Sequence, residues 1–385
     1  MDELNALTQE EASRNGVFWA LYSDSTLDTL SASRGANGLL IIEQASLHEN
    51  SLLPFTGRAS IPGQDGVHSN LRLVSVACAS TSNGTGLKIS QPNFFGLLDA
   101  MSVNRHALYL IQNEYDGFHI IPNGPTMTFF IGTWLYALAW SFDPSDLSTR
   151  AIFIDRSRDC YAPFVELLKR FLQYTSSPAL LAFVTAVHVT RFDDTTTSHE
   201  LAHIHFVARE IGYDSRRHVK SGMKHDINKL TNYHQLIGGT LENIANKLRH
   251  LGLVDSLFTF VMEDPTFSTP ISGTMMEGML VNTEYLRRAV PVLRSQRDAY
   301  GEYVRYQKEQ AERLSEVLFG LLTHEDSLIN INIANLSTEL ARASKEDSST
   351  MKAIAILTMA FLPATFFATL FALPTLESET VVLDI

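Results

Sequence analysis

The stretch AIAILTMAFLPATFFATLFALPTL, from Ala353 to Leu376, decides the architecture of this 385-residue chain. It runs for 24 residues without a charged side chain. About 20 consecutive apolar residues span a bilayer as a helix. We therefore predict a transmembrane helix over residues 351–376, followed by a polar tail over 377–385. A buried C-terminal core helix is the alternative, which Pro363 in mid-segment keeps open.

The charges on the two sides of this segment predict its orientation. Basic residues precede it and only acidic residues follow it: Arg342, Lys345 and Lys352 before, and Glu377, Glu379 and Asp384 after. Because basic residues stay on the cytoplasmic side, we expect a membrane protein whose N-terminal domain is cytoplasmic. The first 16 residues contain neither a basic region nor an apolar run, so we expect no signal peptide.

One face of the predicted membrane helix is more polar than the rest. Residues spaced by four, three and four positions share a helix face, and four residues here follow that spacing: Thr358, Leu362, Thr365 and Thr369. This face is our candidate pore lining, with Met351 and Met359 as candidate apolar constrictions. The alternative is that each threonine bonds its own backbone.

A second helical pattern precedes the membrane segment. Apolar residues recur at spacings of three and four, or multiples of these, from Leu286 to Leu321, and resume with a shifted phase at Ile329, Ile333, Leu336, Leu340 and Ala343. Such a seam is typical of a coiled coil with a stutter. We predict a self-associating stalk helix over residues 281–350. Two antiparallel helices broken near Thr323–Asp326 are the alternative.

Residues 66–280 carry the signals of an α/β domain. We predict strands at Leu71–Cys78, Thr128–Phe142 and Arg150–Asp155, and helices at Ser90–Met101, Phe164–Leu172, Ser177–Val189 and Ile227–Leu251. The segment Glu200–Ile211 is ambiguous between strand and helix, and Asp264–Gly273 reads as a boundary loop. Residues 1–65 are turn-rich, and we expect a peripheral region with little core of its own.

Composition excludes several classes of protein. The formal net charge of −12 argues against a nucleic-acid partner, which would need a clustered basic surface. The two cysteines, Cys78 and Cys160, exclude a disulfide framework and a multi-cysteine zinc site. We find no phosphate-binding loop and no nucleophile elbow, so we expect no enzyme and no cofactor. We interpret His234 and His250 as part of a solvated surface.

One motif points to a different chemistry. His199, Glu200 and His203 satisfy HExxH, in which two helical histidines bind zinc and the glutamate activates water. However, Phe206 occupies the glycine position of the longer zinc-binding form, and Glu210 and Asp214 are the nearest acids downstream. A zinc metallopeptidase is therefore a remote alternative.

The junction of stalk and membrane segment resembles a known family. Ser344–Thr358 (SKEDSSTMKAIAILT) followed by Phe361–Phe366 (FLPATF) is similar to the passage from stalk to membrane in the fungal branch of the CorA-like magnesium transporters. More weakly, Leu71–Cys78 and Val187–Glu210 resemble the N-terminal domain of that group. The resemblance implies a homopentamer in the bilayer that conducts Mg²⁺ or another divalent cation. It also places the HExxH residues on a cytosolic strand.

The chain departs from the family pattern at the filter. The family has a Gly-Met-Asn filter before a second membrane helix, whereas this sequence reads Phe371-Ala372-Leu373-Pro374-Thr375 there and continues only with ESETVVLDI after Leu376. We expect divalent-cation transport, or a degenerate or regulatory form from a truncated gene product. A soluble or tail-anchored interaction protein is the alternative of a different class.

Overall fold

The computed structural model describes residues 2–14, 18, 26–35, 39–56, 67–81, 84–123, 126–156, 159–213, 226–263 and 273–372. The chain divides into two units. The first comprises Met1–Arg216 and Leu236–Leu314, and the second Arg217–Gln235 and Ser315–Ile385. The predicted polar tail and nearly all of the predicted boundary loop, residues 264–272, lie outside the described residues.

The first unit contains a sheet of eight strands. The strands are β1 (Thr26–Gly35), β2 (Leu40–His48), β3 (Val67–Thr81), β4 (Gly84–Leu87), β5 (Gly117–Asn123), β6 (Thr126–Gly132), β7 (Tyr136–Asp143) and β8 (Ser148–Asp155). Their order is β2-β1-β3-β8-β7-β6-β5, and β4 pairs with β3 off this path. The β3–β8 pair is parallel, and the other pairs are antiparallel.

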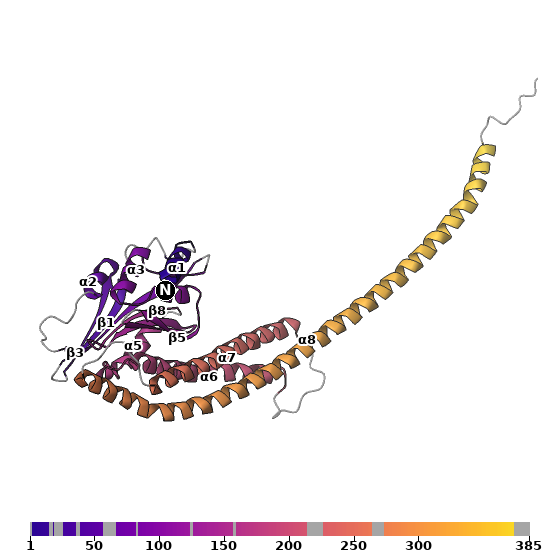
Figure 1. The fold of residues 1–385 in the computed structure, drawn as a ribbon. Coiled ribbons are helices and arrows are strands. Elements are labelled where there is room, and N and C mark those ends of the chain that lie inside the picture. The colour runs from indigo at the N-terminus through magenta and orange to yellow at the C-terminus, as the bar shows by residue number, and fades with distance from the viewer. Residues whose placement is uncertain are drawn as a thin grey trace, which may run out of the picture. The chain divides into compact units, whose positions relative to one another are not determined.

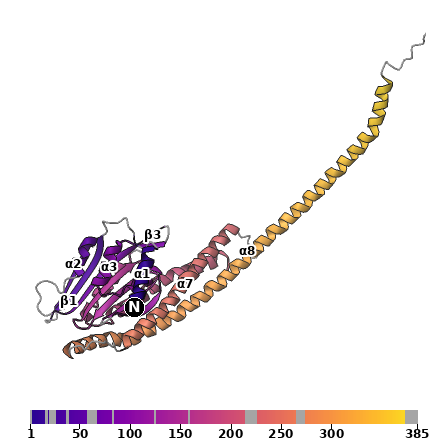
Figure 2. The same ribbon diagram turned by 45° about the horizontal axis from the view of Figure 1, so that its top comes forward.

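The helices lie on both faces of this sheet and continue beyond it. They are α1 (Asp2–Arg14), α2 (Leu52–Thr56), α3 (Gln91–Ala100), α4 (His106–Gln112), α5 (Tyr161–Lys169), α6 (Leu180–Glu210), α7 (Ile227–Met262) and α8 (Gly273–Phe371), with 3-10 turns at Glu49–Ser51 and Leu172–Tyr174. Figure 1 shows α2 and α3 above the sheet and α5 and α6 below it, and Figure 2 shows α2 and α3 on the same side of the sheet. The result is an α/β domain of three layers.

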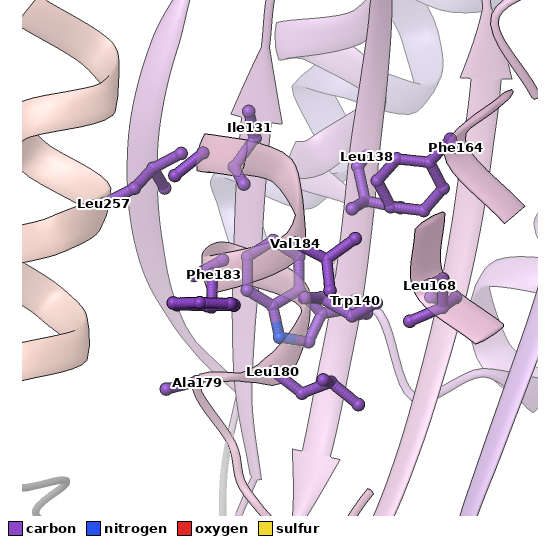
Figure 3. Close-up of a cluster of buried hydrophobic side chains, with 14 of the residues drawn as sticks. Ile131, Leu138, Trp140, Phe164, Leu168, Ala179, Leu180, Phe183, Val184 and Leu257 are labelled. Atoms are coloured by element: carbon purple, nitrogen blue, oxygen red, sulfur yellow. The ribbon is translucent and has the colours of Figure 1, made fainter. Parts of the chain in front are cut away.

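Each face of the sheet has its own hydrophobic core, and β7 shows why. Successive side chains of a strand point to opposite faces of the sheet. Tyr136, Leu138 and Trp140 belong to the core on the side of α5 to α8. Ala137 and Ala139 belong to the core on the side of α2 to α4. In Figure 3, Trp140 lies among Leu138, Phe164, Leu168, Leu180, Phe183 and Val184. A strand buried on both faces reads as a continuous apolar run, which is how β7 appears in the sequence.

Most of the predicted strands and helices of the α/β domain are confirmed, with one difference in the sheet. The run Thr128–Phe142, predicted as strand, forms two antiparallel strands, β6 and β7. The turn between them is organised by Thr133, whose hydroxyl accepts the backbone N–H groups of Leu135 and Tyr136. A threonine that captures two backbone donors is a local signal for a turn.

The expectation that residues 1–65 contribute little core is wrong for the first strand. β1 lies between β2 and β3 in the sheet, and its Leu30 and Ala32 are fully buried in the core beneath α5 to α8. The sequence of β1, TLDTLSASRG, hides this role because small polar residues fill many of its positions. Backbone pairing on both sides, rather than apolar side chains, determines its place.

The long C-terminal helix is continuous. α8 is 99 residues long and shows no break at Thr323–Asp326, so the alternative of two antiparallel helices is wrong. Its N-terminal part belongs to the first unit, where Met279, Leu286 and Val290 join the core. At about 1.5 Å per residue, a helix of this length measures about 150 Å along its axis.

Candidate functional site

The apolar end of α8 is the first candidate site. Among the helices of the described residues, α8 is the one long and apolar enough to cross a membrane, and no residue of its apolar window is buried. Every described residue from 326 to 372 is exposed. The alternative of a buried core helix is therefore wrong for this segment as far as Ala372.

The structure places the predicted pore-lining residues on α8 as the spacing requires. Thr358, Leu362, Thr365 and Thr369 are all in helical conformation and exposed, as are Met351 and Met359. The hydroxyl groups of the three threonines donate to backbone carbonyls of the same helix. Thr358 bonds Ile354 at 2.8 Å, Thr365 bonds Phe361 at 3.0 Å and Thr369 bonds Thr365 at 3.0 Å.

These bonds are the ones that the alternative interpretation describes, in which each threonine bonds its own backbone, and they use the one proton of each hydroxyl. A hydroxyl has one donor and two acceptor sites. Since the donor of each threonine is used by its own helix, the oxygen presents acceptor capacity to whatever lies beside this face. A row of such oxygens contacts cations or water more readily than the apolar side chains around it.

The HExxH residues lie on a helix, so their expected position on a strand is wrong. α6 carries His199, Glu200 and His203, and the ambiguous segment Glu200–Ile211 is helical through Glu210. His199 is exposed, and His203 Nδ1 lies 3.4 Å from the Thr240 hydroxyl. Glu200 points away from this surface into the protein, where its carboxylate accepts a bond of 2.7 Å from Lys247 Nζ.

The structure gives the glutamate of this motif a partner other than a metal-bound water. The glutamate that would activate water is buried in an ion pair with Lys247. Within the part of the chain that the structure describes, no group of three or more His, Cys, Asp or Glu side chains is placed to hold a metal ion. Of the three motif residues, Glu200 is the buried one.

Sequence reasoning missed the second candidate site, a buried polar cluster where α6, α7 and α8 meet. We define the cluster by six residues: Asp193, Thr197 and Glu200 on α6, Lys247 and His250 on α7, and Tyr300 on α8. Five of them are at most 5% exposed, Tyr300 being the exception. The prediction of a solvated surface for His250 is wrong.

One hydroxyl joins the three helices. Thr197 Oγ1 donates to the Asp193 backbone carbonyl at 2.6 Å, accepts from Lys247 Nζ at 3.0 Å, and lies 2.7 Å from the Tyr300 hydroxyl. Because its single proton is already used, Tyr300 must be the donor in the last bond. The side chain of Thr197 is therefore fully bonded, and it links α8 to both α6 and α7.

The second pair of the cluster connects α6 to α7. His250 Nδ1 lies 3.0 Å from both carboxylate oxygens of Asp193, whereas His250 Nε2 is buried without a hydrogen-bond partner among the described residues. Burial raises the pKa of the Asp193 carboxyl, and the bond to His250 opposes part of that shift. Burial also raises the pKa of the Tyr300 hydroxyl, which stays protonated.

A pattern in the sequence points to this cluster in retrospect. Asp193, Thr197 and Glu200 are spaced by four and three residues, and Lys247 and His250 by three, so each set shares one helix face. Opposite charges on facing helices are a sign of buried pairing. The signal is weak because the same spacing also describes a solvated helix face.

An open hollow of about 410 Å³ lies on the surface between α7 and the N-terminal part of α8. Gly252 and Gly301 help to line it, since neither has a side chain to fill the space. Its rim is charged, and Arg297 on that rim is paired with Asp255 at 2.7 Å and with Asp298 at 2.5 Å. These charged side chains on the rim therefore form ion pairs with one another.

The comparisons with known proteins add no relative. No family model matches this chain, and a search of curated proteins finds no match.

Proposed function

We propose that this chain is a CorA-like membrane protein, anchored by α8 with its α/β domain in the cytosol, whose activity is transport of a divalent cation such as Mg²⁺ by a homo-oligomer. The observation that carries the proposal is the continuity of α8. One helix begins among the core residues of the α/β domain, continues through the predicted stalk and ends in an uncharged, wholly exposed segment. The resemblance at Ser344–Thr358 implies the same architecture.

The threonine face supports a role in contacting water or ions. Thr358, Thr365 and Thr369 keep their hydroxyl donors on the helix backbone, so that their oxygens are free to accept. In a single helix crossing a bilayer this face is tolerated against lipid as well, because each hydroxyl donor is satisfied within the helix. A surrounding ring of identical helices would instead bring the oxygens together around an aqueous path.

The stalk supports assembly with further copies of the same chain. Leu336 and Leu340 are 64% and 73% exposed, and Ile329 and Ile333 on the same seam are also exposed. Apolar residues at coiled-coil spacing are covered when helices associate. A homo-oligomer, a pentamer by the resemblance, covers this seam and aligns the membrane segments in one step.

The first test measures magnesium uptake by a transport-deficient cell that expresses this chain. A second strain expresses the chain extended with a Gly-Met-Asn filter and a second membrane helix. The matched variant of each replaces Thr358, Thr365 and Thr369 with valine, which has the same shape without the hydroxyl. Rescue that depends on the threonines supports transport. Rescue only by the extended chain indicates a non-conducting, regulatory form, and rescue by neither contradicts the proposal.

The second test measures which face of the membrane segment meets water. Single cysteines are placed at Thr358, Thr365 and Thr369, and control cysteines at Ala360 and Phe367 on the opposite side of the helix. We expect water-soluble thiol reagents to label the first set in the assembled protein and to spare the controls. Equal labelling of both faces, or of neither, contradicts the assigned pore lining.

Fractionation separates the proposal from the alternative of an interaction protein with an apolar tail. An integral membrane protein stays in the pellet when membranes are washed at alkaline pH, because its helix is embedded in lipid. A protein whose tail docks on another protein is released. Release of this chain would contradict the transporter proposal and favour an interaction protein.

A further inference from the structure

The two histidines of the HExxH motif have no role in the proposed function, and the structure places them on one face of a helix. His199 and His203 are four residues apart on α6, a spacing at which Cβ atoms lie about 5–6 Å from each other. His199 is exposed and His203 is half-buried. Two helical histidines at this spacing can bind the same metal ion. The pair therefore meets the first geometric requirement of a metal site.

The tautomer of His203 is determined by its neighbour on α7. The Thr240 hydroxyl donates its single proton to the Leu236 backbone carbonyl at 2.9 Å. The same oxygen lies 3.4 Å from His203 Nδ1, so His203 is the donor in this contact and Thr240 is the acceptor. Because Nδ1 of the neutral ring carries the proton, Nε2 keeps the lone pair with which an imidazole binds a metal.

The contact with Thr240 is also of the kind that metal-binding histidines make. A histidine that binds a metal through one ring nitrogen almost always donates the N–H of the other nitrogen to a neighbouring acceptor, which fixes the orientation of the ring. Thr240 is 1% exposed, so this acceptor is held in the interior of the helical bundle. One ligand of the pair is therefore oriented by the fold itself.

We propose that His199 and His203, the latter oriented by Thr240, form a surface site on α6 for one divalent transition-metal ion such as Zn²⁺, Cu²⁺ or Ni²⁺. Imidazole nitrogens suit these metals, whereas Mg²⁺ prefers oxygen ligands. The two rings are the protein ligands, and water completes the coordination. Glu200 is bonded to Lys247 at 2.7 Å and is not a ligand. Metal binding here is independent of the proposed transport function, in which Mg²⁺ is the ion.

Calorimetric titration of the full chain in detergent with Zn²⁺, in the presence of excess Mg²⁺, tests the site. Because the chain has 13 histidines, the site is measured as the difference between the native chain and the variant H199A/H203A. We expect the native chain to bind one more Zn²⁺ than this variant does. Equal numbers of bound Zn²⁺ in the two proteins would overturn the proposal.

Single variants test the role of each residue. T240V keeps the shape of the side chain but removes the acceptor for His203 Nδ1, so we expect Zn²⁺ to bind about 10- to 100-fold more weakly. H199A and H203A each remove a ligand and should weaken binding at least as much as T240V does.

The matched control is H205A, which removes an exposed histidine on a different face of α6. This variant should bind Zn²⁺ as the native chain does. Native affinity in H199A, H203A or T240V, or an equal loss of affinity in H205A, would contradict the proposed site.

Discussion

At the scale of single residues, the role that a sequence motif predicts for a side chain can differ from the contacts it makes in the folded protein. Glu200 belongs to an HExxH match, yet its carboxylate is 2.7 Å from Lys247 Nζ, with both side chains 5% exposed. Pattern reasoning identified the three residues of the motif but not the helix that presents them. The partner that decides the role of Glu200 lies 47 positions away in the chain, which no local spacing reveals.

The buried ion pair predicts an asymmetry between single and double variants. K247M leaves the Glu200 carboxylate buried and unpaired, which costs about 3–5 kcal/mol. The double variant E200L/K247M removes both charges and should be closer to the native protein than K247M is. Denaturant unfolding of the full chain in detergent measures both. The single variant E200L completes the comparison. If the double variant loses as much unfolding free energy as E200L and K247M lose together, the two side chains are not coupled.

His188 predicts a loss of stability in acid. Its ring is buried beneath Tyr136, whose hydroxyl lies 3.1 Å from Nδ1, and burial lowers its pKa from 6.5 to about 4. Below pH 6.5 the unfolded chain binds a proton at His188, whereas the folded protein does not bind it until the pH approaches 4. Stability therefore falls as the pH drops from 6.5 toward 4, by up to about 3 kcal/mol.

The variant H188Q isolates this contribution. It retains a polar group for Tyr136 but cannot titrate, so its unfolding free energy should depend less on pH between about 6.5 and 4. The comparison with the native chain is needed because Asp193, whose pKa is raised, contributes with the opposite sign. An equal slope in both proteins would exclude His188 as the acid-sensitive group.

At the scale of elements, the long helix was the most predictable part of the molecule. The three-and-four spacing of apolar residues and the uncharged segment after it led to one helix, and α8 is one helix over 99 residues. The strand β1 was missed because its evidence is backbone pairing on two sides, which leaves no apolar periodicity. Local sequence patterns do not show which distant strands will pair with a given strand.

The exposed seam of α8 predicts a change in assembly. Aspartates at Leu336 and Leu340 would place charges in the interface between stalks, and we expect the oligomer to dissociate to monomers. The matched control carries the same change one position later, at Ser337 and Ala341, outside the seam. Light scattering of the detergent-solubilised protein gives both masses. Dissociation of both variants, or of neither, would contradict a seam at these residues.

At the scale of the whole molecule, the class of fold could be predicted from sequence and the function could not. The sheet and the apolar helix both leave periodic signals, whereas the polar cluster depends on three helices meeting at Thr197. The pore face of α8 remains a prediction for the same reason. In the proposed assembly, its neighbours belong to other copies of the chain.

Membrane insertion has its own prediction. Arginines at Leu357 and Phe367, away from the threonine face, place two charges within the apolar segment, each costing about 2.5–3.5 kcal/mol at the centre of a membrane helix. We expect this variant to move from the membrane pellet to the supernatant or to be degraded. The control has arginines at Ser344 and Ser349, before the segment, and should remain in the membrane. An L357R/F367R variant that stays embedded would contradict a transmembrane role.

The position of α8 in the chain also sets an order for biosynthesis. Met279, Leu286 and Val290 complete the core beneath the sheet, and they are translated before the apolar residues that begin at Ala353. Because chains leave the ribosome from the N-terminus, the described core residues of the α/β domain are synthesised ahead of the apolar segment. The nascent domain can therefore finish folding at the ribosome before the apolar segment appears, so folding of the domain and the proposed insertion into a bilayer do not compete for the same residues.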